Sequence, residues 1–315
     1  MSIDALYLAL RGELSKVIFG QEEAIDFALT ALFSCGHVLL EGPPGVAKTL
    51  LVRTLASVVE LDCQRIQMTP DLLPTDITGS SIYREQSKSF DFHRGPIFAN
   101  FLLADEINRA SARTQSALLE AMQELHVTYD GQSHTLPEPF LVFATQNPIE
   151  QEGTYPLPLA QLDRFMFKVI LQYPAAADER RVLNEHHANA GLPAPERERV
   201  RKVATGADLL EARRTIRQTH VREEVIDYTQ RLLQATRAHD SLEVGASPRS
   251  GLMLLMGAKG LARFAGRDFV TPDDIKTALL PTLRHRVVLN ASAELEGITA
   301  DQVLGEITDQ VEIPR

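Results

Sequence analysis

Apolar residues recur at helical intervals near the start of the chain and then gather into short runs. Residues 21–33 carry apolar side chains at intervals of three and four, which predicts a helix with one buried face, and a second helix is expected from about Thr49. Since strands that alternate with helices form parallel sheets, we expect an α/β fold with a five-stranded parallel sheet flanked by helices. The predicted strands are Val38–Leu40, Arg65–Met68, Phe101–Ala104, Leu141–Ala144 and Val169–Leu171.

Two segments interrupt this alternation. Residues 69–97 lack a regular period and contain several prolines and glycines, so we predict a long insertion between core elements. Residues 127–136 are predicted as a hairpin that turns at Asp130-Gly131. Between them, Ser111 is placed to cap a helix.

The pattern changes after Tyr173-Pro174. The next segment is rich in Ala, Arg and Glu and predicts helices joined by a loop near residues 191–193. From about Val221 the chain is predicted to be all-helical, with an N-cap and proline pair at Ser247-Pro248. We therefore expect three parts: a core at 1–174, a helical linker at 175–220 and a helical domain at 221–315.

Composition narrows the classes of protein. The chain has 315 residues, 44% of them hydrophobic and 23% charged, which is ordinary for a globular protein. Its net charge of −10 argues against tight non-specific binding of nucleic acid. We expect no membrane span and no secretory signal. Cys35 and Cys63 cannot form a disulfide framework, so they are expected to be buried thiols in a reducing, cytoplasmic location.

Residues Gly42–Thr49 read Gly-Pro-Pro-Gly-Val-Ala-Lys-Thr and directly follow the first predicted strand. A glycine-bearing loop between a strand and a helix can wrap backbone N–H groups around phosphates. Lys48 would then reach the β- and γ-phosphates, and the Thr49 hydroxyl would hold Mg²⁺. The usual spacing has glycine where Ala47 stands, so we expect Ala47 to have a negative φ, with its methyl group directed away from the phosphates.

Polar residues follow two of the predicted strands. Asp105 and Glu106 end the third strand, where Asp105 could enter the Mg²⁺ shell and Glu106 could orient and polarise the attacking water. The alternative is a solvated acidic loop. Asn147 follows the fourth strand and could contact the γ-phosphate or that water, or it could cap a turn before Pro148.

Two arginines have open interpretations. Arg164, beside Asp163, is either a surface ion pair or an arginine finger that reaches a neighbouring subunit's γ-phosphate. Arg249 falls in the first turn of a predicted helix, where a cation is unfavourable unless an anionic ligand compensates for it. The alternative for Arg249 is a solvent-facing side chain.

Taken in order and spacing, these residues resemble the MoxR family of AAA+ ATPases over nearly the whole chain. Alanine before the Walker A lysine is common in that family. The resembling segments, in chain order, are Phe19-Gly20-Gln21 near the adenine, Gly42–Thr49 as Walker A, 102–110 as Walker B, 144–148 as sensor 1, 162–165 with the arginine finger, 246–250 as sensor 2, and 266–272 with 284–286 in the lid.

The resemblance implies a P-loop NTPase core with a C-terminal all-helical lid domain that closes over the nucleotide. It implies ATP and Mg²⁺ as cofactors, a homo-oligomeric ring that is typically a hexamer, and a protein client, often with a von Willebrand factor A domain partner. The implied catalytic residues are Glu106, Asn147, Arg164 and Arg249, and the implied Mg²⁺ ligands are Thr49 and Asp105. The implied nucleotide-binding residues are Phe19, Gly20, Gln21, Gly42, Pro43, Pro44, Gly45, Val46, Ala47, Lys48, Thr49 and Leu50.

Three functions compete. The leading one is an ATP-driven remodelling chaperone whose insertion and hairpin pass motion to a client. The second is a nucleic-acid motor, because Lys88, Arg84, His93 and Arg94 alternate with aromatic residues in the insertion, although the net charge argues against it. The third is a nucleotide-switched scaffold with little turnover.

Overall fold

A parallel sheet of five strands forms the centre of the molecule. The computed structural model describes residues 1–84, 88–148, 154–188 and 200–314, so the expected loop near residues 191–193 lies outside the described residues. The strand order is β2-β5-β8-β1-β9, and every pairing in this sheet is parallel. The predicted five-stranded parallel sheet is confirmed. The strands are β1 (His37–Glu41), β2 (Cys63–Gln67), β5 (Phe101–Asp105), β8 (Leu141–Gln146) and β9 (Phe165–Ile170).

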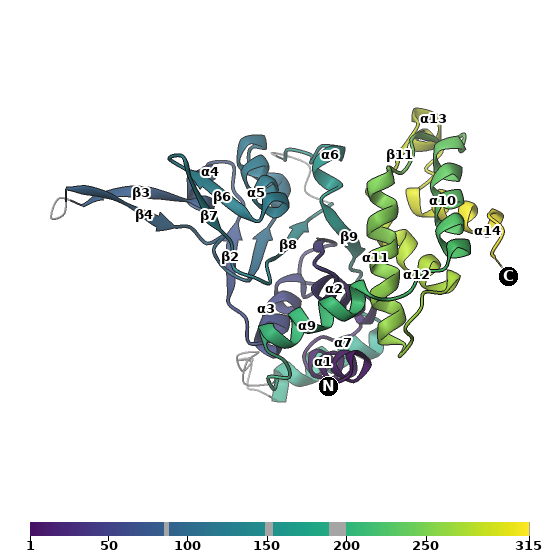
Figure 1. Ribbon diagram of the computed structural model, residues 1–315, viewed down its shortest axis with the longest axis horizontal. Helices are drawn as coiled ribbons and strands as arrows, with labels where there is room; N and C mark the ends of the chain where they lie inside the picture. The colour runs from purple at the N-terminus through teal and green to yellow at the C-terminus, as the bar shows by residue number, and fades with distance from the viewer. Residues whose placement is uncertain (85–87, 149–153, 189–199, 315) are drawn as a thin grey trace.

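Helices cover both faces of this sheet (Figure 1). Alternate strand residues enter two separate apolar clusters, because successive side chains on a strand point to opposite faces. Val38 and Leu40 join the cluster under α1–α3 and α9, whereas Leu39 joins the cluster under α4 and α5. These helices are α1 (Ile3–Leu14), α2 (Glu22–Ser34), α3 (Lys48–Val58), α4 (Pro74–Thr78), α5 (Ala112–Glu124) and α9 (Gly206–Arg217).

The insertion at 69–97 is more ordered than its sequence indicates. It contains α4 and an antiparallel hairpin of β3 (Gly79–Arg84) and β4 (Ser89–Arg94), which projects from the body of the protein (Figure 1). The predicted hairpin at 127–136 is present as β6 (His126–Tyr129) and β7 (Gln132–Thr135). The Phe92 ring stacks on the His134 ring at 4.2 Å between centroids, so the two hairpins contact each other.

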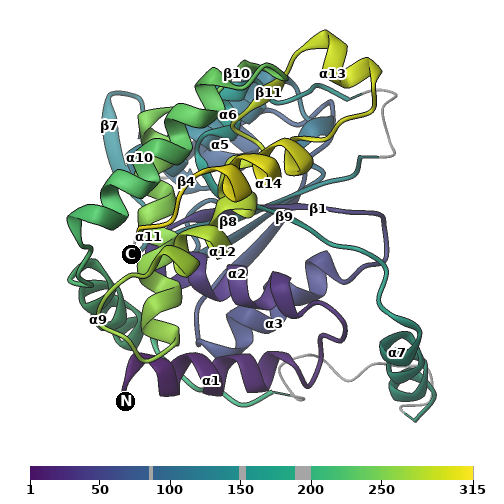
Figure 2. The same cartoon turned by 90° about the vertical axis from the view of Figure 1, so that its right-hand side faces the viewer.

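Among the remaining described residues, the regular elements are helices, the short strand pair β10–β11 and an isolated bridge between His220 and Phe269. The paired strands β10 and β11 are antiparallel, a feature that the sequence analysis did not anticipate in its helical domain. Figure 2 shows α7 at the periphery of the core. The elements are α6 (Leu159–Leu162), α7 (Ala176–Ala188), α10 (Glu223–Ala238), β10 (Leu242–Val244), α11 (Pro248–Phe264), α12 (Pro272–Leu283), β11 (Val288–Leu289), α13 (Ala291–Leu295) and α14 (Ala300–Gln310).

Helices α11 and α12 attach this C-terminal helical unit, residues 221–315, to the side of the core. Helix α11 packs on α1 and α2, and α12 packs on β9. The Phe264 ring stacks on the Tyr7 ring at 4.1 Å. Gly257 allows close approach, since a Cβ there would lie 2.9 Å from the Phe167 ring. No helix among the described residues is long and apolar enough to cross a membrane.

Candidate functional site

The loop of residues 42–49 lies at the carboxyl end of β1 and leads into α3. Gly45 has φ +82°, a conformation that favours glycine. A Cβ on Gly42 would lie 2.5 Å from the Leu171 carbonyl oxygen, so only glycine fits there. The Lys48 ammonium donates a 2.6 Å hydrogen bond to the Gly42 carbonyl oxygen. The loop therefore curls over its own lysine at the start of a helix, the arrangement that a phosphate-binding loop requires.

The expectation for Ala47 is wrong. This residue has φ +67° and ψ +21°, which is the left-handed region, and it immediately precedes α3. The reason is that the loop must reverse into the helix at this residue, and the helical dihedral angles begin only at Lys48. A non-glycine residue in this region carries strain of about 1–2 kcal/mol, which the surrounding loop must support.

Asp105 is the last residue of β5 and lies at the carboxyl edge of the sheet, where β8 separates β5 from β1. Its two carboxylate oxygens have different partners. Oδ1 accepts a hydrogen bond from the Thr145 hydroxyl, and Oδ2 accepts from the Arg65 guanidinium at 2.7 Å. Thr145 and Arg65 are site residues that the sequence analysis missed. Their roles depend on strand register, which brings β2 and β8 to either side of β5.

Glu106 is the next residue and turns sharply away from the strand. Its φ of +57° is left-handed, and its N–H donates to the Thr145 hydroxyl at 2.8 Å. Glu106 Oε2 accepts hydrogen bonds from Gln67 at 2.8 Å and Arg109 at 3.0 Å. Backbone strain in non-glycine residues is concentrated at functional sites. Here the left-handed conformation turns the Glu106 carboxylate away from the direction of the strand.

Asn147 and the segment 19–21 complete this edge. Asn147 is buried and follows β8, which pairs directly with β1. Gln21 donates a 2.7 Å hydrogen bond to the Gln172 carbonyl oxygen, just beyond β9, and Phe19 lies under the Arg181 guanidinium. The predicted nucleotide and Mg²⁺ residues therefore all lie at or just beyond the carboxyl ends of the strands.

These residues fit Mg²⁺ and a nucleotide. A hydroxyl at Thr49 and a carboxylate at Asp105 are the hard oxygen ligands that Mg²⁺ prefers. The Arg65 side chain that holds Asp105 is 51% exposed, so it can move aside when a cation takes that carboxylate. Gly45 has no atom within 4 Å of its Cβ position, so the outer side of the loop is open.

Arg164 and Arg249 lie at the opposite edge of the sheet. Arg164 directly precedes β9, whose first residue, Phe165, pairs with His37 at the start of β1. Arg249 and Arg164 line one hollow together with His37. The loop at 42–49 begins at the other end of β1. Because β1 has five residues, its two ends are roughly 16 Å apart.

This placement corrects one implication of the resemblance. The C-terminal helical unit does not bring Arg249 over the chain's own loop. Helix α11 instead docks on α1 and α2, which directs its first turn toward the amino edge of the sheet. Within the described chain, the two arginines are together but apart from Lys48, Asp105, Glu106 and Asn147.

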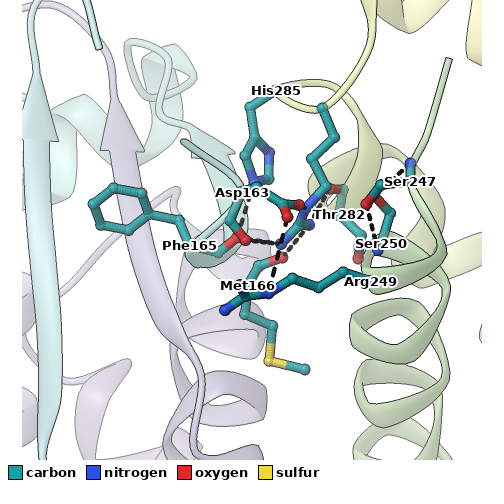
Figure 3. Close-up of polar contacts among 9 residues, drawn as sticks. Asp163, Phe165, Met166, Ser247, Arg249, Ser250, Thr282 and His285 are labelled. Carbon is teal, nitrogen blue, oxygen red and sulfur yellow. Dashed lines mark hydrogen bonds and ion pairs between the residues drawn. The ribbon is translucent and has the colours of Figure 1, made fainter. Parts of the chain in front are cut away.

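A buried arginine joins the C-terminal unit to the segment that carries Arg164. Arg286 donates to Asp163 Oδ1 at 2.7 Å and to the carbonyl oxygens of Asp163, Phe165 and Met166. Its side chain is 1% exposed, and this burial lowers the pKa of Arg286 while the Asp163 hydrogen bond opposes that shift. Figure 3 shows Asp163, Phe165 and Met166 facing Arg249, Thr282 and His285 of the C-terminal helical unit. Sequence reasoning gave Arg286 no such role, because neither its burial nor its partners have a local signal.

His285 belongs to the same contact between the C-terminal helical unit and the segment that carries Arg164. One of its ring nitrogens, Nε2, lies 2.9 Å from the Phe165 carbonyl oxygen, and burial lowers the pKa of His285 well below its usual value. A neutral imidazole with Nε2 protonated can donate that hydrogen bond. His285 is therefore structural, and the described residues contain no cluster suited to hold a metal by His, Cys, Asp and Glu alone.

The cysteine prediction is wrong for Cys35. Cys35 is exposed and Cys63 is partly buried, and neither forms a disulfide. Cys35 follows the last residue of α2 in a left-handed conformation, and its Sγ accepts a weak 3.9 Å hydrogen bond from the Arg217 guanidinium. Burial raises the pKa of Cys63 to about 11, which suits an inert thiol. The expected reducing location stays a prediction.

Comparison with known proteins identifies relatives along the whole chain. The family described as "ATPase family associated with various cellular activities (AAA)" matches residues 37–167, and the family described as "AAA lid domain" matches residues 234–307. Chaperone MoxR1 of Mycobacterium tuberculosis is 45% identical over 96% of this chain and 81% of its own length. The uncharacterised protein YeaC of Bacillus subtilis is 44% identical, over 96% of this chain and 92% of its own.

A solved structure has the same overall arrangement. This crystal structure, assigned as an ATPase from Cytophaga hutchinsonii, superposes with a TM-score of 0.90 at 42% identity. The match covers 99% of this chain and 96% of that chain. The similarity therefore includes the core, the C-terminal helical unit and their relative position.

Proposed function

Because this chain belongs to the MoxR family of AAA+ ATPases, we propose that it is a Mg²⁺-dependent ATPase that works as an oligomeric ring and remodels client proteins as a chaperone. The name of the Mycobacterium relative, a chaperone, supports the client role. A hexameric ring and a von Willebrand factor A domain partner are part of the same proposal and rest on the family resemblance.

The observation that carries the proposal is the separation of the site into two halves. One edge of the sheet has the loop, Asp105, Glu106 and Asn147, and the opposite edge has Arg164 and Arg249. Neither half can reach the other within one chain. A ring solves this, because the arginine edge of one copy can face the loop edge of the next, and each nucleotide then lies between two subunits.

In this arrangement each group of residues has a separate role in binding or hydrolysis. The loop N–H groups and Lys48 would bind the phosphates, and Thr49 with Asp105 would hold Mg²⁺, which supplies charge neutralisation when bound. Glu106 would orient and polarise the attacking water, with Asn147 beside it. Arg164 and Arg249 of the next copy would stabilise the charge that develops on the γ-phosphate.

The two hairpins are the proposed route to the client. The β3–β4 hairpin exposes Ile82 and Tyr83, and its base packs on the β6–β7 hairpin through Phe92 and His134. Movement at the nucleotide edge can pass through α4 and α5 to both hairpins. The nucleic-acid alternative stays a prediction. Within the insertion, the Arg94 guanidinium lies over the Phe98 ring at 5.2 Å.

Phosphate release with and without Mg²⁺ tests the ATPase. We expect Lys48→Ala and Glu106→Gln each to lower turnover about 100-fold or more, because one loses phosphate binding and the other loses the group that activates water. ATP binding should weaken in Lys48→Ala and persist in Glu106→Gln. Lys276→Ala, on the partly exposed surface of α12, is the matched control and should match the wild type.

Two outcomes would overturn the proposal. Unchanged turnover in pure Lys48→Ala protein would exclude the loop as the site of hydrolysis. Tight ATP binding with no hydrolysis in either the wild type or Glu106→Gln would favour a nucleotide-switched scaffold.

A further inference from the structure

The hollow at the amino edge of the sheet has an unusual concentration of arginine. It measures about 420 Å³ and lies between the start of β1, the end of β7, helix α9 and the first turns of α11. Its lining includes five arginines and one glutamate, Glu138, in a chain whose net charge is −10. The five are Arg164, Arg213, Arg214, Arg217 and Arg249.

Three of these arginines come from one face of α9. Arg217 lies one helical turn beyond both Arg213 and Arg214, so the Arg217 side chain is a neighbour of the other two on the helix surface. Arg213 is buried, and its Nε and one terminal nitrogen donate to the Leu32 carbonyl oxygen at 3.0 and 2.8 Å. Arg214 and Arg217 are exposed on the wall of the hollow.

These cations are poorly neutralised within the chain. Among the described residues, Arg164, Arg213 and Arg217 have no carboxylate within ion-pairing distance. Arg214 has only an exposed contact with Glu211 at 3.5 Å, and Arg249 only a 3.9 Å contact with Asp163, whose carboxylate Arg286 already holds. His37 does not add charge, because burial lowers its pKa to about 4. The hollow therefore has a positive field that its one lining carboxylate, Glu138, offsets only in part.

The chemistry of the lining favours phosphate. All five cations are arginines, whose planar guanidinium binds phosphate oxygens in pairs and stays charged when partly desolvated. Two of them are the arginines that the proposed function assigns to a neighbour's γ-phosphate. The α9 arginines share the same hollow and extend the positive surface beyond the γ-phosphate position.

We propose that this hollow is a phosphate-chain site for the nucleotide held by the next copy of the chain, and that Arg217 and Arg214 of α9 are further binding residues in it. The site is incomplete in one chain, since the loop that holds the nucleotide comes from the neighbour. This inference rests on the proposed function and extends it from two arginines to a set that includes α9.

Steady-state kinetics with matched variants test the proposal. The variants to compare are Arg217→Ala and the double variant Arg214→Ala/Arg217→Ala. The matched control is Arg231→Ala, which changes an exposed arginine of α10 outside the hollow. Loss of one charge-assisted hydrogen bond should lower kcat/KM about tenfold in Arg217→Ala, and more in the double variant. Arg231→Ala should match the wild type.

Mixing experiments then separate action across the interface from a structural effect. Arg217→Ala subunits keep an intact loop, and Lys48→Ala subunits keep intact arginines, so mixed assemblies should regain activity at the interfaces that combine the two. A parallel mixture of Arg164→Ala with Lys48→Ala tests the proposed function itself. If that mixture regains activity while Arg217→Ala behaves like Arg231→Ala, the α9 site is excluded and the proposed function stands.

Two further results would overturn the inference. Absence of recovery in the Arg217→Ala mixture, despite confirmed co-assembly, would mean that Arg217 does not act on the neighbour's nucleotide. Wild-type kinetics in Arg217→Ala, together with a response to poly-glutamate that this variant loses, would assign the hollow to an acidic peptide.

Discussion

At the scale of single residues, the candidate nucleotide site contains two left-handed residues that are not glycine. Ala47 ends the phosphate-binding loop at φ +67°, and Glu106 follows β5 at φ +57°. Both conformations result from a chain reversal immediately beside a position that must present a polar group. The strain at Ala47 is supported by the loop contacts of Gly42 and Lys48 and by the first turn of α3.

Replacing Ala47 by glycine should therefore stabilise the protein. Removing the left-handed strain of alanine raises the free energy of unfolding by about 1–2 kcal/mol. The greater entropy of glycine in the unfolded state lowers it by about 0.4–1 kcal/mol. We expect Ala47→Gly to raise the free energy of unfolding by about 0.5–1 kcal/mol in urea titrations, with ATPase activity retained.

Ala56→Gly is the matched control, because Ala56 lies inside α3 in a helical conformation. Glycine there should lower stability by about 1 kcal/mol. Equal losses in the two variants would contradict the strain at Ala47.

At the scale of elements, the packing of α12 on β9 determines the position of Arg164. Arg286 follows α12, and its guanidinium binds both the Asp163 carboxylate and three backbone carbonyls around the start of β9. The segment that carries Arg164 is therefore fixed by the C-terminal helical unit as well as by the sheet. A movement of that unit would move Arg164 and Arg249 together.

A double-mutant cycle on Asp163 and Arg286 tests whether this contact stabilises the protein. Arg286→Met leaves the Asp163 carboxylate without its buried partner and should cost about 3–5 kcal/mol of unfolding free energy. Adding Asp163→Asn removes that unpaired charge, so the double variant should lose less than the sum of the single losses by at least about 1 kcal/mol.

The exposed pair Glu211 and Arg214 is the control, and its cycle should give a coupling energy below about 0.5 kcal/mol. Strictly additive losses at Asp163 and Arg286 would show that the two side chains do not act as a unit.

At the scale of the whole molecule, the core and the C-terminal unit share buried surface. Phe264 of α11 packs between Tyr7 and Phe33, and Gly257 and Gly260 allow α11 to approach the Phe167 ring and helix α2 closely. The domain boundaries predicted at 174 and 220 mark changes in composition. They stay predictions, and the apolar contacts across them favour one cooperative structure.

Calorimetry should therefore show one unfolding transition in the absence of nucleotide. Gly257→Ala places a Cβ 2.9 Å from the Phe167 ring and should lower the Tm of that single transition. Gly305→Ala, in α14 with no atom within 4 Å of its Cβ position, should leave the Tm unchanged or raise it. Two separate transitions, with only one shifted by Gly257→Ala, would show that the parts unfold independently.

The sequence by itself predicted the parallel sheet and the hairpin at 127–136. It did not predict the hairpin at 79–94, which it indicated only as an irregular insertion. The roles of the residues at the loop edge stay predictions from the sequence. Apolar runs and a glycine-bearing loop before Lys48 are local signals, because strand burial and tight turns constrain neighbouring residues directly. The order and spacing of Asp105, Glu106, Asn147 and Arg164 then indicated the family.

Only the tertiary structure decided which of these residues lie together. Strand register brings Arg65 and Thr145 to Asp105, and the docking of α11 brings Arg249 to Arg164 at the edge away from Lys48. The burial of Arg286, the exposure of Cys35 and the left-handed Ala47 likewise have no local signal. Each depends on contacts between segments far apart in the chain, or on a loop closing against its own helix, and a pattern of residue types does not encode that geometry.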